Sequence, residues 1–268
     1  MPTDQRSQLR YIQWKEDFRR EKPYQVLMDV PDGCPTSNFI VAQEPEQLIE
    51  DLRGQESNFN LDDHAFAIQN DHQRLTVWDK DTVETQYFPQ IEEILKRAMG
   101  PSIKVYIFDW RTELEAGTVV DLNDPLRYLA PVQGVHVDQS GAAARKRVVH
   151  HMGENAAELL KGRFRIVKYA IPKIVNSYGL LNTSHSVWRP LRNPIEDWPL
   201  AVCDGSTVPE DKLLAADHVR KTYVGESLYP MFSENMRWYY LSRQTKDEVI
   251  LLKTYDSSPN VRARCEWF

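Results

Sequence analysis

From residue 100 onward the chain consists of short extended runs separated by turn signals, and this pattern constrains the fold more than any other feature. Strand-like runs occur at residues 104–110, 134–138, 164–167, 200–203, 238–242 and 248–255. Turn-forming sequences such as Asn193-Pro194 and Asp204-Gly205 lie between them. No Gly-rich phosphate loop follows any run, which argues against a doubly wound nucleotide-binding fold. We therefore predict an α+β chain with a mainly β core, built as a sandwich or jelly roll.

The N-terminal part of the chain adds helical decoration to this core. From Tyr87 to Met99 apolar residues recur three and four positions apart, and Gly100-Pro101 then ends the pattern, which predicts a helix. The spacing of apolar residues also predicts helical structure within residues 44–53, 154–160 and 211–221.

Composition narrows the class of protein. The chain has 268 residues, 41% hydrophobic and 27% charged, and a net charge of -6, which disfavours a disordered protein or a general nucleic-acid binder. No apolar run approaches the roughly 18 residues that a membrane span needs. Three cysteines without paired spacing, Cys34, Cys203 and Cys265, indicate a reduced, cytoplasmic protein.

The sequence His136-Val137-Asp138 is the first candidate for chemistry. Residues two apart on a strand point to the same face, so an imidazole and a carboxylate here can meet one metal ion. Two histidines and one carboxylate form the facial triad of non-haem Fe(II) oxygenases. The alternative is a strand histidine hydrogen-bonded to a nearby aspartate. The other histidines with ligand potential are more simply interpreted as surface residues: His64, His72, His150, His151 and His218.

Two aromatic segments, Trp238-Tyr239-Tyr240 and Trp188-Arg189-Pro190, have two interpretations. The first is core packing together with a buried arginine ion pair. The second is the wall of a substrate pocket, formed by Trp188, Trp238 and Tyr240, with Arg189 available to bind a carboxylate through two nitrogens.

Several segments, taken in order, resemble the fungal hydroxylase/desaturase family typified by AsaB, with gibberellin-desaturase-like and cephalosporin methoxylase (CmcJ-like) relatives. The matching segments are PDGCPTSNF (31–39), IEDLRGQESNFNLD (49–62), YFPQIEEILKRAMG (87–100), VYIFDW (105–110), PVQGVHVDQS (131–140), VWRPL (187–191), EDWPLAVCD (196–204) and RWYYLSRQTKDEVILLKTYDS (237–257).

This resemblance implies an Fe(II)- and 2-oxoglutarate-dependent oxidoreductase on a double-stranded β-helix, a jelly-roll or cupin-like fold. Such an enzyme hydroxylates or desaturates a small molecule in fungal secondary-metabolite biosynthesis. The resemblance implies that His136 and Asp138 are two of three iron ligands, and it makes Arg189 a candidate for cofactor binding. The partner it implies is a small-molecule substrate, with no nucleic acid and no membrane.

The chain departs from the family pattern at two places. Members run almost directly from R-F-x-I-V into N-V-W-R-P-L, whereas this chain carries residues 168–186 in between. Members also continue past the Tyr255-Asp256-Ser257 region into A-R-x-x-P-H-x-x-F, whereas Ala263-Arg264 is followed here by Cys265-Glu266-Trp267-Phe268. The resemblance therefore implies that the third iron ligand and the C-terminal strands are missing.

Retained intron sequence would explain both departures. The codons for Lys168-Tyr169-Ala170 can contain a GT splice-donor site, and those for His185-Ser186 can contain an AG splice-acceptor site. Removing the nucleotides between these two sites keeps the reading frame and restores the family pattern. The alternative is an inactive or non-oxidative member: a binding protein, an isomerase or a cyclase. We expect one oxygenase-like domain over residues 1–268, with a non-family insertion at 168–186 and a truncation after residue 264.

Overall fold

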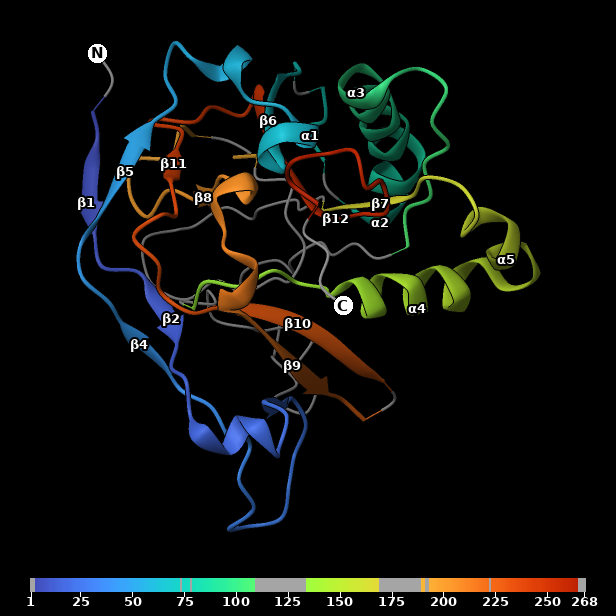
Figure 1. The fold of residues 1–268 in the computed structure, drawn as a ribbon. Coiled ribbons are helices and arrows are strands. Elements are labelled where there is room, and N and C mark those ends of the chain that lie inside the picture. Colours follow the sequence, from blue (N-terminus) through green and yellow to red (C-terminus); the bar gives the residue numbers. More distant parts are fainter. Residues whose placement is uncertain are drawn as a thin grey trace.

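The strand β12 (Glu248–Asp256) organises the fold (Figure 1). The computed structural model describes residues 3–72, 74–77, 79–108, 134–168, 189–190, 193–221 and 223–264. Within these residues β12 pairs antiparallel with β6 (Phe66–Asn70) along one edge and with β7 (Arg165–Lys168) along the other.

Both faces of β12 are buried, which accounts for its apolar run from Val249 to Leu252. Val249 and Leu251 pack on one face in a cluster with side chains of helix α3 (Phe88–Met99). Ile250 packs on the other face in a cluster with Phe66 and Tyr239. Successive strand residues point to opposite faces, so one strand supplies two apolar clusters.

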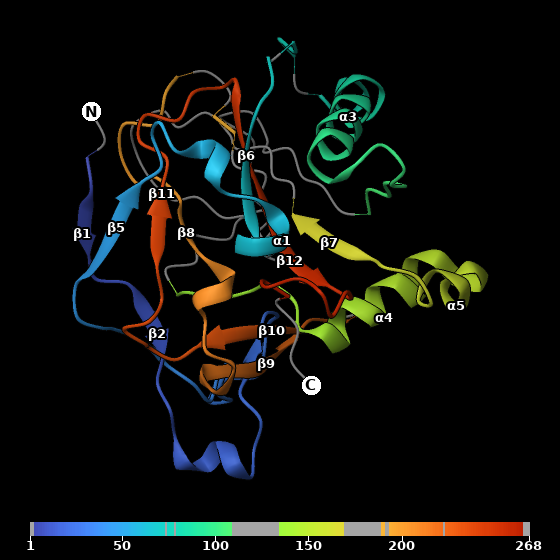
Figure 2. The ribbon, with the colours of Figure 1, turned by 45° about the horizontal axis from the view of Figure 1, so that its top comes forward.

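The remaining strands form three further sheets, which Figure 2 shows from a second side. The four-stranded sheet has the order β1 (Gln5–Ser7), β5 (Gln47–Asp51), β11 (Trp238–Tyr240) and β8 (Ala201–Cys203). The three-stranded sheet has the order β10 (Val224–Pro230), β9 (Leu213–Val219) and β3 (Tyr24–Val26). The two-stranded sheet consists of β2 (Arg10–Ile12) and β4 (Val41–Gln43).

Helices in the described part are few and mostly short. Besides α3 they are α1 (Leu61–His64), α2 (Lys80–Thr82), a π-helical stretch (Val83–Tyr87), α4 (Gly141–Met152) and α5 (Ala156–Leu159). Single 3-10 turns span Glu16–Arg19, Glu56–Asn58, Gly153–Asn155, Gly205–Thr207 and Glu210–Lys212. The fold is therefore mixed and mostly sheet, as the sequence predicts.

Several local predictions are confirmed. The helix predicted over residues 87–99 is α3, and Gly100 ends it with a φ of 104°, a conformation that glycine adopts without strain. Strands predicted at 164–167, 200–203, 238–242 and 248–255 are β7, β8, β11 and β12. The strand predicted at 134–138 is reduced to isolated bridges at Gly134 and Val137, with a bend at Asp138. The strand predicted at 104–110 is wrong over its described residues, since 104–108 form no strand; 109–110 lie outside the described residues.

Other local predictions are wrong, and strand pairing explains two of them. Residues 47–51, predicted as helical, form β5 because they pair with both β1 and β11. Residues 213–219, also predicted as helical, form β9 between β10 and β3. Residues 153–160 hold a 3-10 turn and the four-residue α5 in place of one helix, and His150 and His151 end α4.

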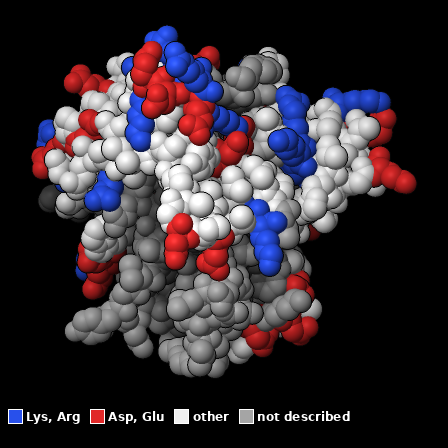
Figure 3. Space-filling model, turned by 90° about the horizontal axis from the view of Figure 1, so that it is seen from below, with Lys and Arg blue, Asp and Glu red and all other residues white. Residues whose placement is uncertain are grey.

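The described surface is mixed in charge where Figure 3 displays it: basic and acidic side chains are interspersed on that face. Among the helices of the described residues, none is long and apolar enough to cross a bilayer. The predicted insertion at 168–186 lies outside the described residues apart from Lys168, and residues 265–268 lie outside them as well.

Candidate metal centre

The predicted metal pair lies on an extended segment, residues 134–138, that runs beside β10. Val137 and Leu228 exchange two backbone hydrogen bonds of 2.7 and 2.8 Å, and the amide of Val135 donates to Arg10 at 2.8 Å. Side chains alternate along such a segment, so His136 and Asp138 share the face opposite Val137. The structure thus brings the two predicted ligands together, with 3.3 Å between His136 Nε2 and Asp138 Oδ1.

The contacts of His136 fix which ring nitrogen carries the proton. Its Nδ1 lies 2.8 Å from the carbonyl oxygen of Gly134, and a carbonyl only accepts, so Nδ1 donates. In the neutral ring Nε2 then carries the lone pair, and it lies 3.3 Å from Oδ1 of Asp138. Two facing lone-pair donors suit a transition metal between them, and a backbone carbonyl on the far nitrogen is a usual outer partner of a metal-binding histidine.

The donor set therefore fits Fe(II) as two ligands. The side chains of His136 and Asp138 are 24% and 15% exposed, so the pair is only partly buried. Within the described residues no group of three or more His, Cys, Asp or Glu side chains could hold a metal ion. With a proton on Nε2 instead of a metal, the same geometry is the histidine–aspartate hydrogen bond of the alternative interpretation.

A second histidine, His218, lies beside this pair on β9. Its Nε2 is 2.9 Å from the hydroxyl of Tyr229, and its Nδ1 is 3.3 Å from Oγ of Ser227. Burial, with a further contribution from the nearby His136, lowers the pKa of His218 to about 4, so the ring is neutral near pH 7. Burial also raises the pKa of Tyr229 to about 12.

The prediction that His218 is an ordinary surface residue on a helix is wrong. It is a partly buried strand residue, opposite Gly225 in the antiparallel pairing of β9 with β10. The signal that could have placed it is the pair of runs LLAADHV and VGESLYP with a short polar turn between them, which is typical of a hairpin.

The segment after Asp138 is fastened to β10 by Ser140. The backbone amide of Ser140 donates to the backbone carbonyl of Glu226 at 3.1 Å, and its hydroxyl donates to the Glu226 carboxylate. The same hydroxyl oxygen caps α4, because it accepts a hydrogen bond from the backbone amide of Ala143 at 3.1 Å. Lys22 donates to the same carboxylate. Burial raises the pKa of Glu226, but the bonds from Lys22 and Ser140 outweigh burial and hold that pKa below its usual value.

Arg189 lies in a buried ion pair beneath α3. Its side chain is fully buried, one nitrogen donates to Asp71 Oδ2 at 2.9 Å, and another donates to the hydroxyl of Tyr87 at 3.2 Å. Arg97 reaches the other oxygen of Asp71 at 2.9 Å. Burial raises the pKa of Asp71, but the two arginines outweigh it and hold that pKa low. This geometry corresponds to the interpretation of Arg189 as a buried ion pair; Trp188 lies outside the described residues.

Trp238 and Tyr240 lie in the core of the four-stranded sheet. Both are 5% exposed and cluster with Tyr11, whose ring meets that of Trp238 edge-on at 6.4 Å. The hydroxyl of Tyr240 donates to the carbonyl of Thr3. Both side chains therefore pack within this cluster, and Tyr240 is in addition hydrogen-bonded to the N-terminal segment.

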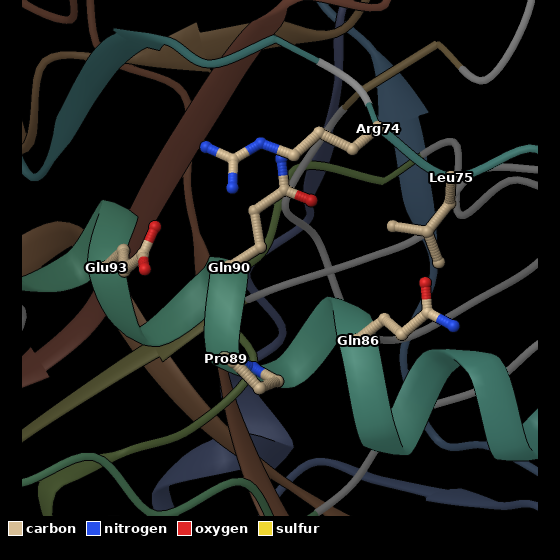
Figure 4. A pocket seen from close by; sticks show the side chains of 6 residues that line it. All are labelled: Arg74, Leu75, Gln86, Pro89, Gln90 and Glu93. Carbon is tan, nitrogen blue, oxygen red and sulfur yellow. The ribbon is translucent and has the colours of Figure 1, made fainter.

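A separate cavity of about 230 Å³ lies where α3 begins (Figure 4). Six residues line it: Arg74, Leu75, Gln86, Pro89, Gln90 and Glu93. None of them is a predicted site residue, so this cavity is distinct from the metal pair.

Comparison with known proteins gives a consistent set of relatives. The family model described as YDMC, an oxidoreductase/YMDC permease-like domain, matches residues 9–266. The Fe(II)/2-oxoglutarate-dependent dioxygenase nvfI of Aspergillus novofumigatus is 35% identical, over 94% of this chain and 83% of its own length. The hydroxylase/desaturase poxK of Penicillium oxalicum is 28% identical, over 92% of this chain and 77% of its own.

A solved structure supports the same grouping. The iron and alpha-ketoglutarate-dependent endoperoxidase NvfI superposes with a TM-score of 0.76 at 30% identity, covering 98% of this chain and 88% of that one.

Proposed function

The chain belongs to the oxidoreductase/YMDC permease-like domain family together with fungal Fe(II)/2-oxoglutarate-dependent dioxygenases and hydroxylase/desaturases, and from this we propose that it oxidises a small molecule with the same cofactors. Fe(II) with 2-oxoglutarate and oxygen supplies the oxidising power to remove hydrogen from carbon. The name of poxK supports hydroxylation or desaturation as the outcome, and the name of NvfI adds endoperoxidation. The proposed substrate is a small molecule of fungal secondary-metabolite biosynthesis.

The observation that carries this proposal is the geometry of His136 and Asp138. The Gly134 carbonyl accepts from His136 Nδ1, which leaves Nε2, 3.3 Å from Oδ1 of Asp138, as the ring nitrogen that can bind a metal. In the proposed enzyme these two side chains are iron ligands, and the backbone bonds of Val137 to β10 hold them in place before the metal binds.

The finer features predicted from the sequence are part of the same proposal. The mostly sheet architecture and the likeness to NvfI support a double-stranded β-helix. The family match over residues 9–266 supports one domain. We also propose that residues 168–186 and the residues after 264 depart from the family pattern, and that the protein is cytoplasmic. The proposed site roles are cofactor binding for Arg189 and pocket lining for Trp188, Trp238 and Tyr240.

A non-oxidative role is the second candidate, because the described residues bring only two of the family's proposed three ligands together. In that case the protein would bind, isomerise or cyclise a small molecule without oxidising it. Equilibrium dialysis with Fe(II) under anaerobic conditions separates the candidates, since two ligands alone hold iron weakly. Micromolar or tighter binding by the chain would contradict the second candidate.

The direct test is turnover of 2-oxoglutarate to succinate with Fe(II) and oxygen. We expect His136→Ala and Asp138→Ala to abolish both iron binding and succinate formation. His72→Ala is the matched control, because the side chain of His72 is 79% exposed and pairs with Asp247 away from the metal pair. If His136→Ala keeps the iron affinity of the unmodified chain, the assignment of the ligands is wrong.

A further inference from the structure

Two polar side chains of β10 lie next to the metal pair without being ligands. The bridge between residues 137 and 228 sets an antiparallel register in which Tyr229 stands beside His136 and Ser227 beside Asp138. The ring centroids of Tyr229 and His136 are 6.1 Å apart. The hydroxyl of Ser227 donates to the backbone carbonyl of Asp138 at 2.9 Å.

The contacts of His218 connect these side chains in a defined proton order. The single proton of Ser227 goes to the Asp138 carbonyl, which only accepts. The 3.3 Å contact between Ser227 Oγ and His218 Nδ1 therefore requires the proton on Nδ1. The neutral ring then presents a bare Nε2 to Tyr229, whose hydroxyl donates across 2.9 Å.

This arrangement of protons needs a rigid side chain between Ser227 and Tyr229, with a hydrogen-bond donor on one side and an acceptor on the other. A neutral imidazole meets that requirement, because each of its nitrogens takes one role. Burial of His218 keeps the ring neutral near pH 7. Its two bonds reach one neighbour of each metal ligand: Tyr229 beside His136, and Ser227 on the backbone of Asp138.

We propose that His218 is a positioning residue of the metal centre, which acts through Ser227 on the backbone of Asp138 and through Tyr229 on the ring of His136. The inference rests on the proposed function, since it requires that His136 and Asp138 bind a metal. Outer partners of metal ligands typically contribute about 10- to 100-fold to metal affinity. We expect the contribution of His218 to metal affinity to lie at the lower end of this range, because His218 makes no direct hydrogen bond to the side chain of either ligand.

The test is titration of the metal-free chain with Co(II), followed by the visible absorption of the bound ion. We expect His218→Ala to weaken Co(II) binding about 10-fold and to change the absorption bands, which report the ligand geometry. His218→Asn retains a donor near the Nδ1 position and should recover part of the affinity through Ser227. His218→Gln retains an acceptor near Nε2 for Tyr229. His72→Gln is the matched control and should leave both readouts unchanged.

A double-mutant cycle with Ser227→Ala tests the route of the effect. If His218 acts through Ser227, the losses of His218→Gln, which removes the donor to Ser227, and of Ser227→Ala relative to the unmodified chain will not add. These milder variants keep the test valid if His218→Ala fails to fold. Unchanged affinity and spectrum in His218→Ala and His218→Gln would overturn the inference. Failure of the unmodified chain to bind Co(II) would instead overturn the proposed function, and the inference with it.

Discussion

Replacing Asp71 with Asn removes the anion on which the buried cation of Arg189 depends. The Arg189 side chain is fully buried and that of Asp71 is 3% exposed, so water cannot replace the lost charge. Removing one partner of a buried pair typically costs about 3–5 kcal/mol. The second cation, Arg97, has a side chain 45% exposed, and its lost pairing adds at most about 1 kcal/mol. We expect a loss near the lower end of about 3 kcal/mol, because the Asn amide oxygen still accepts hydrogen bonds.

Urea unfolding measures this loss, with Arg97→Ala as the control variant at about 1 kcal/mol or less. Replacing both partners, Arg189→Met with Asp71→Leu, should restore much of the stability, because it leaves no buried charge unpaired. A loss below about 0.5 kcal/mol for Asp71→Asn would refute the reasoning, because that is the range of surface substitutions. An Arg189→Met variant of unchanged stability but raised KM for 2-oxoglutarate would favour the cofactor-binding role instead.

Three further predictions follow from the packing and the pKa shifts. Burial lowers the pKa of His218 to about 4, so the folded state favours the neutral ring and stability should fall as the pH drops from about 6.5 to 4. Urea midpoints measured over this pH range should fall less steeply for His218→Gln. An equal slope in the variant and the unmodified chain would contradict the pKa shift. A Cβ on Gly205 would lie 2.8 Å from Cβ of Ala65, so Gly205→Ala should lower the free energy of unfolding by about 1–3 kcal/mol, as measured by thermal unfolding. Gly162→Ala is the control without this loss, because a Cβ there would make only an ordinary contact of 3.7 Å with the carbonyl oxygen of Leu159. Ser140→Ala removes the cap of α4 and should cost about 1 kcal/mol, whereas Ser140→Thr should restore most of it; equal stability of the three forms would show that the cap is not needed.

The sequence was sufficient for structure that depends on local signals. The helix α3 follows from apolar spacing and from Gly100, and the strands β8, β11 and β12 follow from composition and flanking turns. The shared face of His136 and Asp138 follows from the period of two alone.

The failures concern structure decided by distant partners. Leu48, Ile49 and Leu52 satisfy helical spacing, yet residues 47–51 become a strand because β1 and β11 offer pairing on both edges. The helix predicted around His218 fails for the same reason, since the strand that forms there depends on pairing with β10 and β3. Its link to Tyr229 and Ser227 needs the register of that hairpin, which short apolar runs do not specify.

The two-sided burial of β12 has a consequence for how this chain tolerates sequence change. A larger side chain at Val249 can be accommodated only by moving the strand away from α3, and that movement compresses the cluster around Ile250 on the other face. Substitutions on one face therefore demand compensation on the other. Among relatives, residues of this strand are expected to change in concert with positions in α3 and β11, while exposed positions drift independently.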